Sequence, residues 1–139
     1  MKRLTITALL LSSLFGCASQ SDSATEAKTL DLQGNWHIEY IGDMPVIDYS
    51  PAKVMFQEEG KLSGNTSCNQ FFGSYQQQGE SLTISPAGTT MKACVDALME
   101  QEQRTMQALS KVTQARMNKG RLEFLDQASG VVMILTKMD

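Results

Sequence analysis

The sequence predicts a mainly β protein of the α+β class, in which a compact antiparallel, barrel-like sheet packs against one amphipathic helix. Short runs with apolar side chains at every second position, separated by turn residues, fill most of the chain from residue 32 onward. One segment, residues 95–110, contains no Gly or Pro and is rich in helix-favouring Ala, Leu, Met, Glu and Gln. Because alternating runs lie on both sides of this segment, we expect a single domain over residues 30–139.

Five strands are expected before the helix, at residues 35–41, 52–57, 61–64, 71–78 and 81–85. The second and third are separated only by Glu58, Glu59 and Gly60, which predicts a tight connection. Pro86 and Gly88 are expected to end the fifth strand, since proline cannot donate to a β ladder.

The expected helix carries an apolar stripe at spacings of three, four and seven, and we predict that this face packs on the sheet. The stripe consists of Val95, Leu98, Met99, Met106 and Leu109. Glu102 interrupts the stripe, so its carboxylate either lies buried under the helix with a functional role or reaches solvent at the margin.

After the helix the period returns to two, and residues 112–117, 121–126 and 131–138 predict a three-stranded meander. Leu122 and Phe124 are expected to face Thr113, Ala115 and Met117 across the first hairpin. The last strand is apolar almost throughout, so we expect it to be covered on both faces and to lie in mid-sheet or against the helix.

The N-terminal segment predicts export and lipid anchoring. Two basic residues precede an uncharged apolar run at residues 4–15, which is shorter than the roughly 20 residues that cross a bilayer as a helix and fits a secretory signal. Residues 14–17 (LFGC) resemble a lipobox, so we predict a signal peptide at 1–16 and lipidation of Cys17. An ordinary secreted protein and an uncleaved anchor are the alternatives.

The residues after the lipobox are small and polar, which predicts a flexible tether over residues 17–29. Ala18 after the lipidated cysteine favours the outer membrane, by resemblance to lipoprotein sorting rules. The predicted location is therefore the bacterial envelope, on the outer membrane and facing the periplasm.

Charge argues against a nucleic-acid partner. The sequence holds 12 Lys and Arg against 15 Asp and Glu, and removal of the signal peptide takes two of the basic residues and none of the acidic ones. An anionic domain without a basic cluster is a poor binder of nucleic acid or of anionic lipid. Contact with the membrane is expected through the lipid on Cys17.

Cys68 and Cys94 remain after lipidation of Cys17, in a compartment where thiols become oxidised, so we predict a disulfide between them. Two other interpretations stay open. Cys68 could be a nucleophile activated by His37, the one histidine, although nothing in their spacing requires it. A zinc site would have only these three soft ligands, without the paired spacing of a structural site. No cofactor or metal is predicted.

Nine methionines is a high count. Three roles are open for Met99, Met106 and Met117: they bind copper, they line an adaptable peptide groove, or they fill the core, which is the ordinary role of this flexible side chain. We favour core filling.

The order of these features resembles the META domain family, which includes heat-inducible, HslJ-like envelope lipoproteins of bacteria. The resemblance covers about residues 32–137, with one departure at Ser67, where many members have Gly. It rests on Trp36, Gly42, Pro45, Val46, Phe56, residues 60–64 (GKLSG), Cys68, Asn69, residues 73–75 (GSY), Leu82, Ile84, residues 90–94 (TMKAC), Met99, Glu100, Gly120, Leu122 and Gly130.

The resemblance implies a β-rich, barrel-like fold with a helix, no recognised catalytic apparatus, and an association with envelope stress and antibiotic tolerance without an agreed ligand. Asn69 follows Cys68 directly, and its amide could bridge backbone groups around the cysteines, a structural role.

Three functions are compatible with the sequence. The preferred one is a non-enzymatic, membrane-anchored lipoprotein that binds or stabilises an envelope protein or small molecule. The first alternative is a periplasmic inhibitor of a lysozyme or protease that inserts residues 73–78 (GSYQQQ) as a loop. The second is a thiol enzyme that uses Cys68 and His37.

Overall fold

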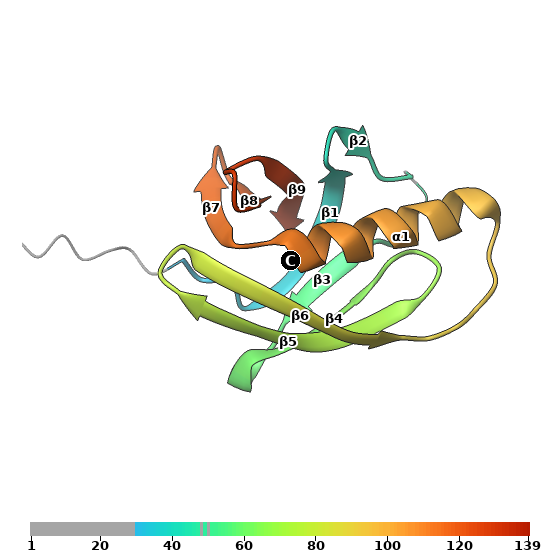
Figure 1. Ribbon diagram of the computed structural model, residues 1–139, viewed down its shortest axis with the longest axis horizontal. Coiled ribbons are helices and arrows are strands. Elements are labelled where there is room, and N and C mark those ends of the chain that lie inside the picture. Colours follow the sequence, from blue (N-terminus) through green and yellow to red (C-terminus); the bar gives the residue numbers. More distant parts are fainter. Residues whose placement is uncertain (1–29, 48, 50) are drawn as a thin grey trace, which may run out of the picture.

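The computed structural model describes residues 30–47, 49 and 51–139. The predicted signal peptide, the lipidated Cys17 and the tether at 17–29 lie outside the described residues. In chain order the elements are β1 (Gly34–Ile41), β2 (Met44–Pro45), β3 (Lys53–Phe56), the 3-10 turn η1 (Glu58–Gly60), β4 (Lys61–Asn65), β5 (Gln70–Gln78), β6 (Ser81–Thr89), α1 (Asp96–Lys111), β7 (Gln114–Asn118), β8 (Arg121–Leu125) and β9 (Val131–Lys137) (Figure 1).

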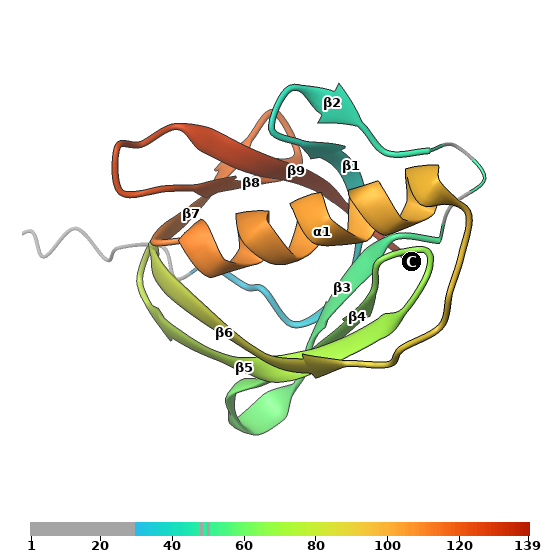
Figure 2. The ribbon, with the colours of Figure 1, turned by 45° about the vertical axis from the view of Figure 1, so that its right-hand side comes forward.

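The described strands form one antiparallel sheet in the order β2-β1-β3-β4-β5-β6-β7-β8-β9, and an additional pairing of β1 with β9 closes it into a ring. Helix α1 lies along the ring beside β6, β9 and β1 (Figure 2). The predicted fold class is therefore confirmed. The predicted mid-sheet position of the last strand is confirmed too, because β9 pairs with β8 on one side and β1 on the other. The predicted cover on both of its faces is wrong in part, since only Met133 and Leu135 of β9 are buried.

The core fills the inside of the ring. The aromatic side chain of Phe56 packs edge to face against those of Tyr75 and Phe124, with ring centroids 4.9 and 6.1 Å apart, respectively. The Trp36 indole is buried as well and donates Nε1–H to the Leu32 carbonyl over 2.7 Å. The hairpin of β7 and β8 has the predicted register, with Ala115 opposite Phe124 and Met117 opposite Leu122, although the Met117 side chain is 46% exposed.

The ring is weakest between β6 and β7. Ser81 and Gln114 are the one register pair there, flanked by hydrogen bonds from Leu82 N–H to the Thr113 carbonyl (3.0 Å) and from Ala115 N–H to the Glu80 carbonyl (2.8 Å). Beyond Leu82, β6 pairs with β5 alone among the described strands. This unpaired edge of β6 runs beside α1 and helps to form the site described below (Figure 2).

The prediction that β6 ends at Pro86 is wrong, because the strand continues to Thr89. Pro86 lies opposite Gly73, next to a bulge in which Ala87 of β6 has no partner on β5. Only one side of β6 is paired there, so the missing N–H of proline leaves no ladder bond unmade. Gly73 allows the close approach, since a Cβ atom at this position would lie 2.4 Å from the Ser85 carbonyl oxygen.

The predicted helical stripe is also partly wrong. The helix begins after Val95, whose backbone is extended and whose side chain is 63% exposed, while Met99 is 48% exposed. The buried residues of α1 are Gln101, Thr105, Ala108 and Leu109. Two polar side chains are therefore buried on the packed face, and both have hydrogen-bond partners: the Thr105 hydroxyl donates to the Gln101 carbonyl over 2.7 Å, and the Gln101 amide binds groups outside the helix.

A buried carboxylate ties β7 to β8. Glu123 is 5% exposed and accepts hydrogen bonds from Arg116 Nε and Asn118 Nδ2, each over 2.8 Å. Burial alone raises the pKa of the Glu123 carboxyl. The two hydrogen bonds and the charges of Arg116 and Arg121 outweigh this effect, so the pKa lies below its usual range.

We expect Glu123→Gln to lower the free energy of unfolding by about 1 kcal/mol at pH 7, because it weakens the bonds to Arg116 and Asn118. A carboxyl with a depressed pKa stabilises the folded state above its unfolded pKa of about 4.3, and this contribution is lost as the pH falls through the folded pKa. Urea unfolding from pH 7 to pH 3 should therefore show the two proteins converging as the solution becomes acidic. An equal difference at both ends of this range would contradict the assignment.

Among the described residues, no helix has the length and apolar character that crossing a membrane requires.

Candidate functional site

The candidate site begins at the turn between β4 and β5. Thr66 N–H donates to the Asn69 carbonyl over 2.8 Å, and Ser67 N–H donates to the Asn65 side chain over 2.7 Å. Ser67 has a φ of +87°, in the left-handed region that favours glycine. The turn geometry thus gives a physical reason for the Gly that many proteins of the resembled family carry at this position.

A disulfide fastens this turn to the start of the helix. Cys68 and Cys94 are bonded, and their Cα atoms lie 5.9 Å apart. Only Val95 separates Cys94 from the first residue of α1. The structure thus places the disulfide that the sequence predicted. A thiolate at Cys68 is not available in this state, and the proposed base His37 lies on β1 opposite Lys53 and Thr136.

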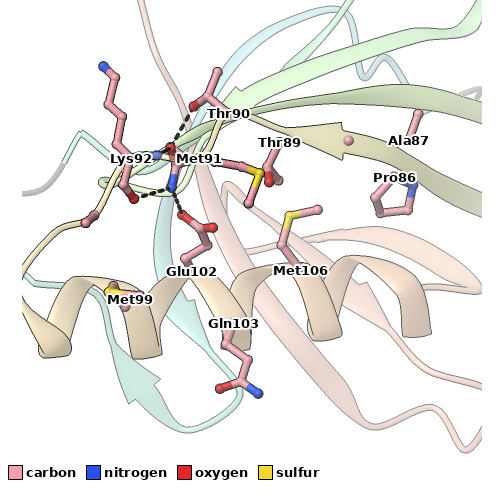
Figure 3. A pocket seen from close by; sticks show the side chains of 13 residues that line it. Pro86, Ala87, Thr89, Thr90, Met91, Lys92, Met99, Glu102, Gln103 and Met106 are labelled. Atoms are coloured by element: carbon pink, nitrogen blue, oxygen red, sulfur yellow. Dashed lines mark hydrogen bonds between the residues drawn. The ribbon is translucent and has the colours of Figure 1, made fainter.

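Asn69 connects the turn, the segment after β6 and the helix. Its side chain is buried, and its Oδ1 accepts hydrogen bonds from the Thr90 hydroxyl and from Lys92 N–H, each over 2.7 Å. Its Nδ2 donates to the Lys92 carbonyl (3.2 Å) and to Glu102 Oε2 (2.9 Å) (Figure 3). Asn69 therefore holds the chain at residues 90–92 in an extended path beside α1.

Glu102 is half-buried and turns toward Asn69, so it is neither fully buried under the helix nor free in solvent at its margin. Oε2 also accepts a hydrogen bond from the Thr66 hydroxyl over 2.8 Å. Within the described part of the chain, Oε1 has no hydrogen-bond partner. The carboxylate is thus oriented by two donors and keeps one oxygen for a further donor.

A hollow of about 700 Å³, which we call the β6–α1 groove, lies above this network. Residues 86–93 form one wall, and Met99, Glu102, Gln103 and Met106 of α1 form the other. Figure 3 shows the side chains of Met91 and Met106 directed into the space between strand and helix. The groove is therefore mainly apolar, with adaptable methionine side chains and one carboxylate, that of Glu102, on its helix wall.

The prediction that Met99, Met106 and Met117 fill the core is wrong in part. Met106 is partly buried and packs on the core, but Met99 and Met117 are 48% and 46% exposed. Met91, which the sequence did not single out, is 97% exposed and lines the groove. The residues from 30 to 139 that the structure describes contain no group of three or more His, Cys, Asp or Glu able to hold a metal ion.

Gln101 is the site residue that the sequence interpretation missed. It is fully buried; its Oε1 accepts a hydrogen bond from Ile47 N–H over 2.9 Å, and its Nε2 donates to the Ser67 hydroxyl over 2.7 Å. It thereby joins α1 to the turn that carries the disulfide. The sequence did contain a signal for this buried polar group. Gln101 and Thr105 are four residues apart, so they lie on the same face of the helix, next to the apolar Ala108 and Leu109.

Residues 73–78 do not form an inserting loop, because they lie within β5. The Tyr75 side chain is buried, and its hydroxyl donates to the Gln57 carbonyl over 3.1 Å. Gln77 Nε2 donates to the Leu30 carbonyl over 2.6 Å. These contacts hold the segment in the sheet, so the inhibitor hypothesis loses the feature that suggested it.

The chain matches the family model described as META domain over residues 28–139. Its fold is similar to that of a DUF4847 family protein from Bacteroides vulgatus, at 13% identity and a TM-score of 0.60, covering 77% of this chain and 95% of that one. A protein from Burkholderia xenovorans, solved by NMR, is similar at 16% identity and a TM-score of 0.62 and covers 99% of both chains. At these identities the likeness concerns the fold alone. A search of curated proteins gave no match.

Proposed function

This chain belongs to the META domain family, and we propose that it is a non-enzymatic, lipid-anchored protein of the bacterial envelope that binds another envelope component in the β6–α1 groove. Binding there serves tolerance of envelope stress or antibiotics. The lipid on Cys17 fixes the domain to the outer membrane, facing the periplasm. The bound component is an envelope protein or a small molecule.

The observation that carries this proposal is the bracing of the groove. The Cys68–Cys94 disulfide and the buried Asn69 amide both hold its walls, and Glu102 presents a free carboxylate oxygen on the helix wall. A pre-formed, mainly apolar hollow with a few oriented polar groups is typical of a ligand site. The engaged sulfur of Cys68 supports binding rather than thiol chemistry.

Photocrosslinking in intact cells tests the proposal. A photoreactive amino acid at Gln103, on the wall of the groove, should capture a component that the same amino acid at the exposed Gln76 of β5 does not. Mass spectrometry of the adduct identifies the component. The same adducts from both positions, or none from Gln103, would refute binding in the groove.

The anchor has its own test. We expect Cys17→Ser to move the protein from the membrane fraction to the soluble periplasmic fraction, because the acyl chains that hold it are lost. The variant should keep the wild-type melting temperature, since residues 30–139 form the folded domain without this side chain. Retention in membranes after a high-salt wash would show that lipid on Cys17 is not the anchor.

A further inference from the structure

The wall of the groove formed by β6 and the residues after it has a free strand edge. In an antiparallel ladder, the backbone groups of successive residues point alternately to the two neighbouring strands. Thr90 N–H bonds to the Gln70 carbonyl, and Lys92 binds the Asn69 side chain through both N–H and carbonyl, so residues 90 and 92 point toward β5 and Asn69. The N–H and carbonyl groups of Thr89 and Met91 therefore point the other way, toward the groove.

Among the described strands β6 has no second neighbour at Thr89, and no described residue forms a hydrogen bond with the backbone of Met91. Pro86 lies on the same edge of β6. Proline has no backbone N–H to donate, so it suits a position that has no partner strand. An unpaired edge of this kind is a template for a further extended chain.

We infer that the β6–α1 groove binds an extended, cationic peptide segment, which adds a strand to the edge at Thr89 and Met91 and places a lysine or arginine side chain on Glu102. The inference rests on the proposed function, since it names the ligand class of the same groove. A peptide is favoured over a compact small molecule because the groove follows residues 86–93 along the strand, at about 3.3 Å per residue.

The side chains of the groove suit such a ligand. On one face of an added strand, alternate side chains point toward α1, where Met99 and Met106 can adapt to different apolar residues. Glu102 Oε1 is available to a cationic side chain, while Oε2 stays on Thr66 and Asn69. The excess of acidic residues also attracts a basic peptide, because removal of Lys2 and Arg3 with the signal peptide leaves 12 − 2 = 10 basic residues against 15 acidic ones.

Peptides selected from a random phage-displayed library against the full-length chain in detergent micelles provide the probe. The selected sequences should be enriched in Lys or Arg, and a synthetic copy should shift the NMR signals of residues 86–93 and 99–106. N-methylation at alternate residues of the copy should weaken binding at least tenfold in one register and little in the other, because only one register donates to the edge. Equal binding of both methylated forms, or recovery of no binding peptide, overturns the inference.

Glu102→Gln tests the contact to the cationic side chain. We expect at least tenfold weaker binding of the lysine peptide and no change for its norleucine analogue. Glu100→Gln, at an exposed position of α1 outside the groove, is the matched control and should bind both peptides as the wild type does. If Glu102→Gln weakened the binding of both peptides equally, Glu102 would shape the groove rather than contact the cationic side chain, and its assigned role would be overturned.

The two proposals fail in different ways. Crosslinks from Gln103 to a lipid, glycan or other non-peptide component, together with no effect of N-methylation, would retain the groove as a binding site and remove the peptide inference. Loss of the Gln103 crosslinks themselves would remove the proposed function.

Discussion

Asn69→Asp is expected to lower the free energy of unfolding by about 3 to 5 kcal/mol at pH 7, the scale of an uncompensated buried charge. The substitution keeps the size of the side chain but replaces Nδ2, which donates to Glu102 Oε2 over 2.9 Å, with an oxygen. Two carboxylates would then face each other in a position where the wild-type residue is 4% exposed. The Lys92 carbonyl would lose a donor as well.

The pH dependence separates this electrostatic effect from a packing defect. Protonation of one of the two carboxyls restores a donor, so the difference from the wild type should shrink as the pH falls from 7 toward 4. Urea unfolding followed by circular dichroism measures it. Gln70→Glu, at the exposed neighbour in β5, is the control for added charge and should change stability little. A wild-type unfolding curve for Asn69→Asp would show that the amide does not hold the groove.

Cys94→Ala is expected to cost about 3 to 4 kcal/mol of stability, because the disulfide closes a loop with a sequence separation of 26 residues and so restricts the unfolded chain. For a domain of this size the loss corresponds to a fall in melting temperature of roughly 10 to 20 °C. Calorimetry in oxidising buffer measures it. Because the disulfide joins the turn at Cys68 to the start of α1, amide exchange at residues 90–92 should also become faster.

Two controls make this result specific. The wild type with a reducing agent should melt near Cys94→Ala, and Cys17→Ser should melt near the oxidised wild type. Identical melting of the wild type and Cys94→Ala in oxidising buffer would mean that the two cysteines are not paired in solution.

Local features of the sequence predicted the helix and every described strand except β2 (Met44–Pro45), because their signals are local. Alternating apolar residues gave the strands, and the stretch without Gly or Pro gave α1, to within a residue of Asp96–Lys111. The pairing of Cys68 with Cys94 and the structural importance of Asn69 were also accessible, since few cysteines remained to pair and Asn69 adjoins one of them. The resemblance to the META domain family pointed to the same residues, Cys68, Asn69 and Cys94.

The site itself depends on long-range register, which no local pattern encodes. The closure of β1 on β9 and the single register pair between β6 and β7 leave an edge of β6 free, and this arrangement also explains why Pro86 does not end the strand. The rotation of α1 is set by partners far along the chain, at Ile47, Thr66 and Ser67, which bury Gln101 and turn Glu102 toward Asn69. Periodicity alone selects the more apolar face of a helix, whereas the tertiary structure buries polar groups wherever it can satisfy their hydrogen bonds.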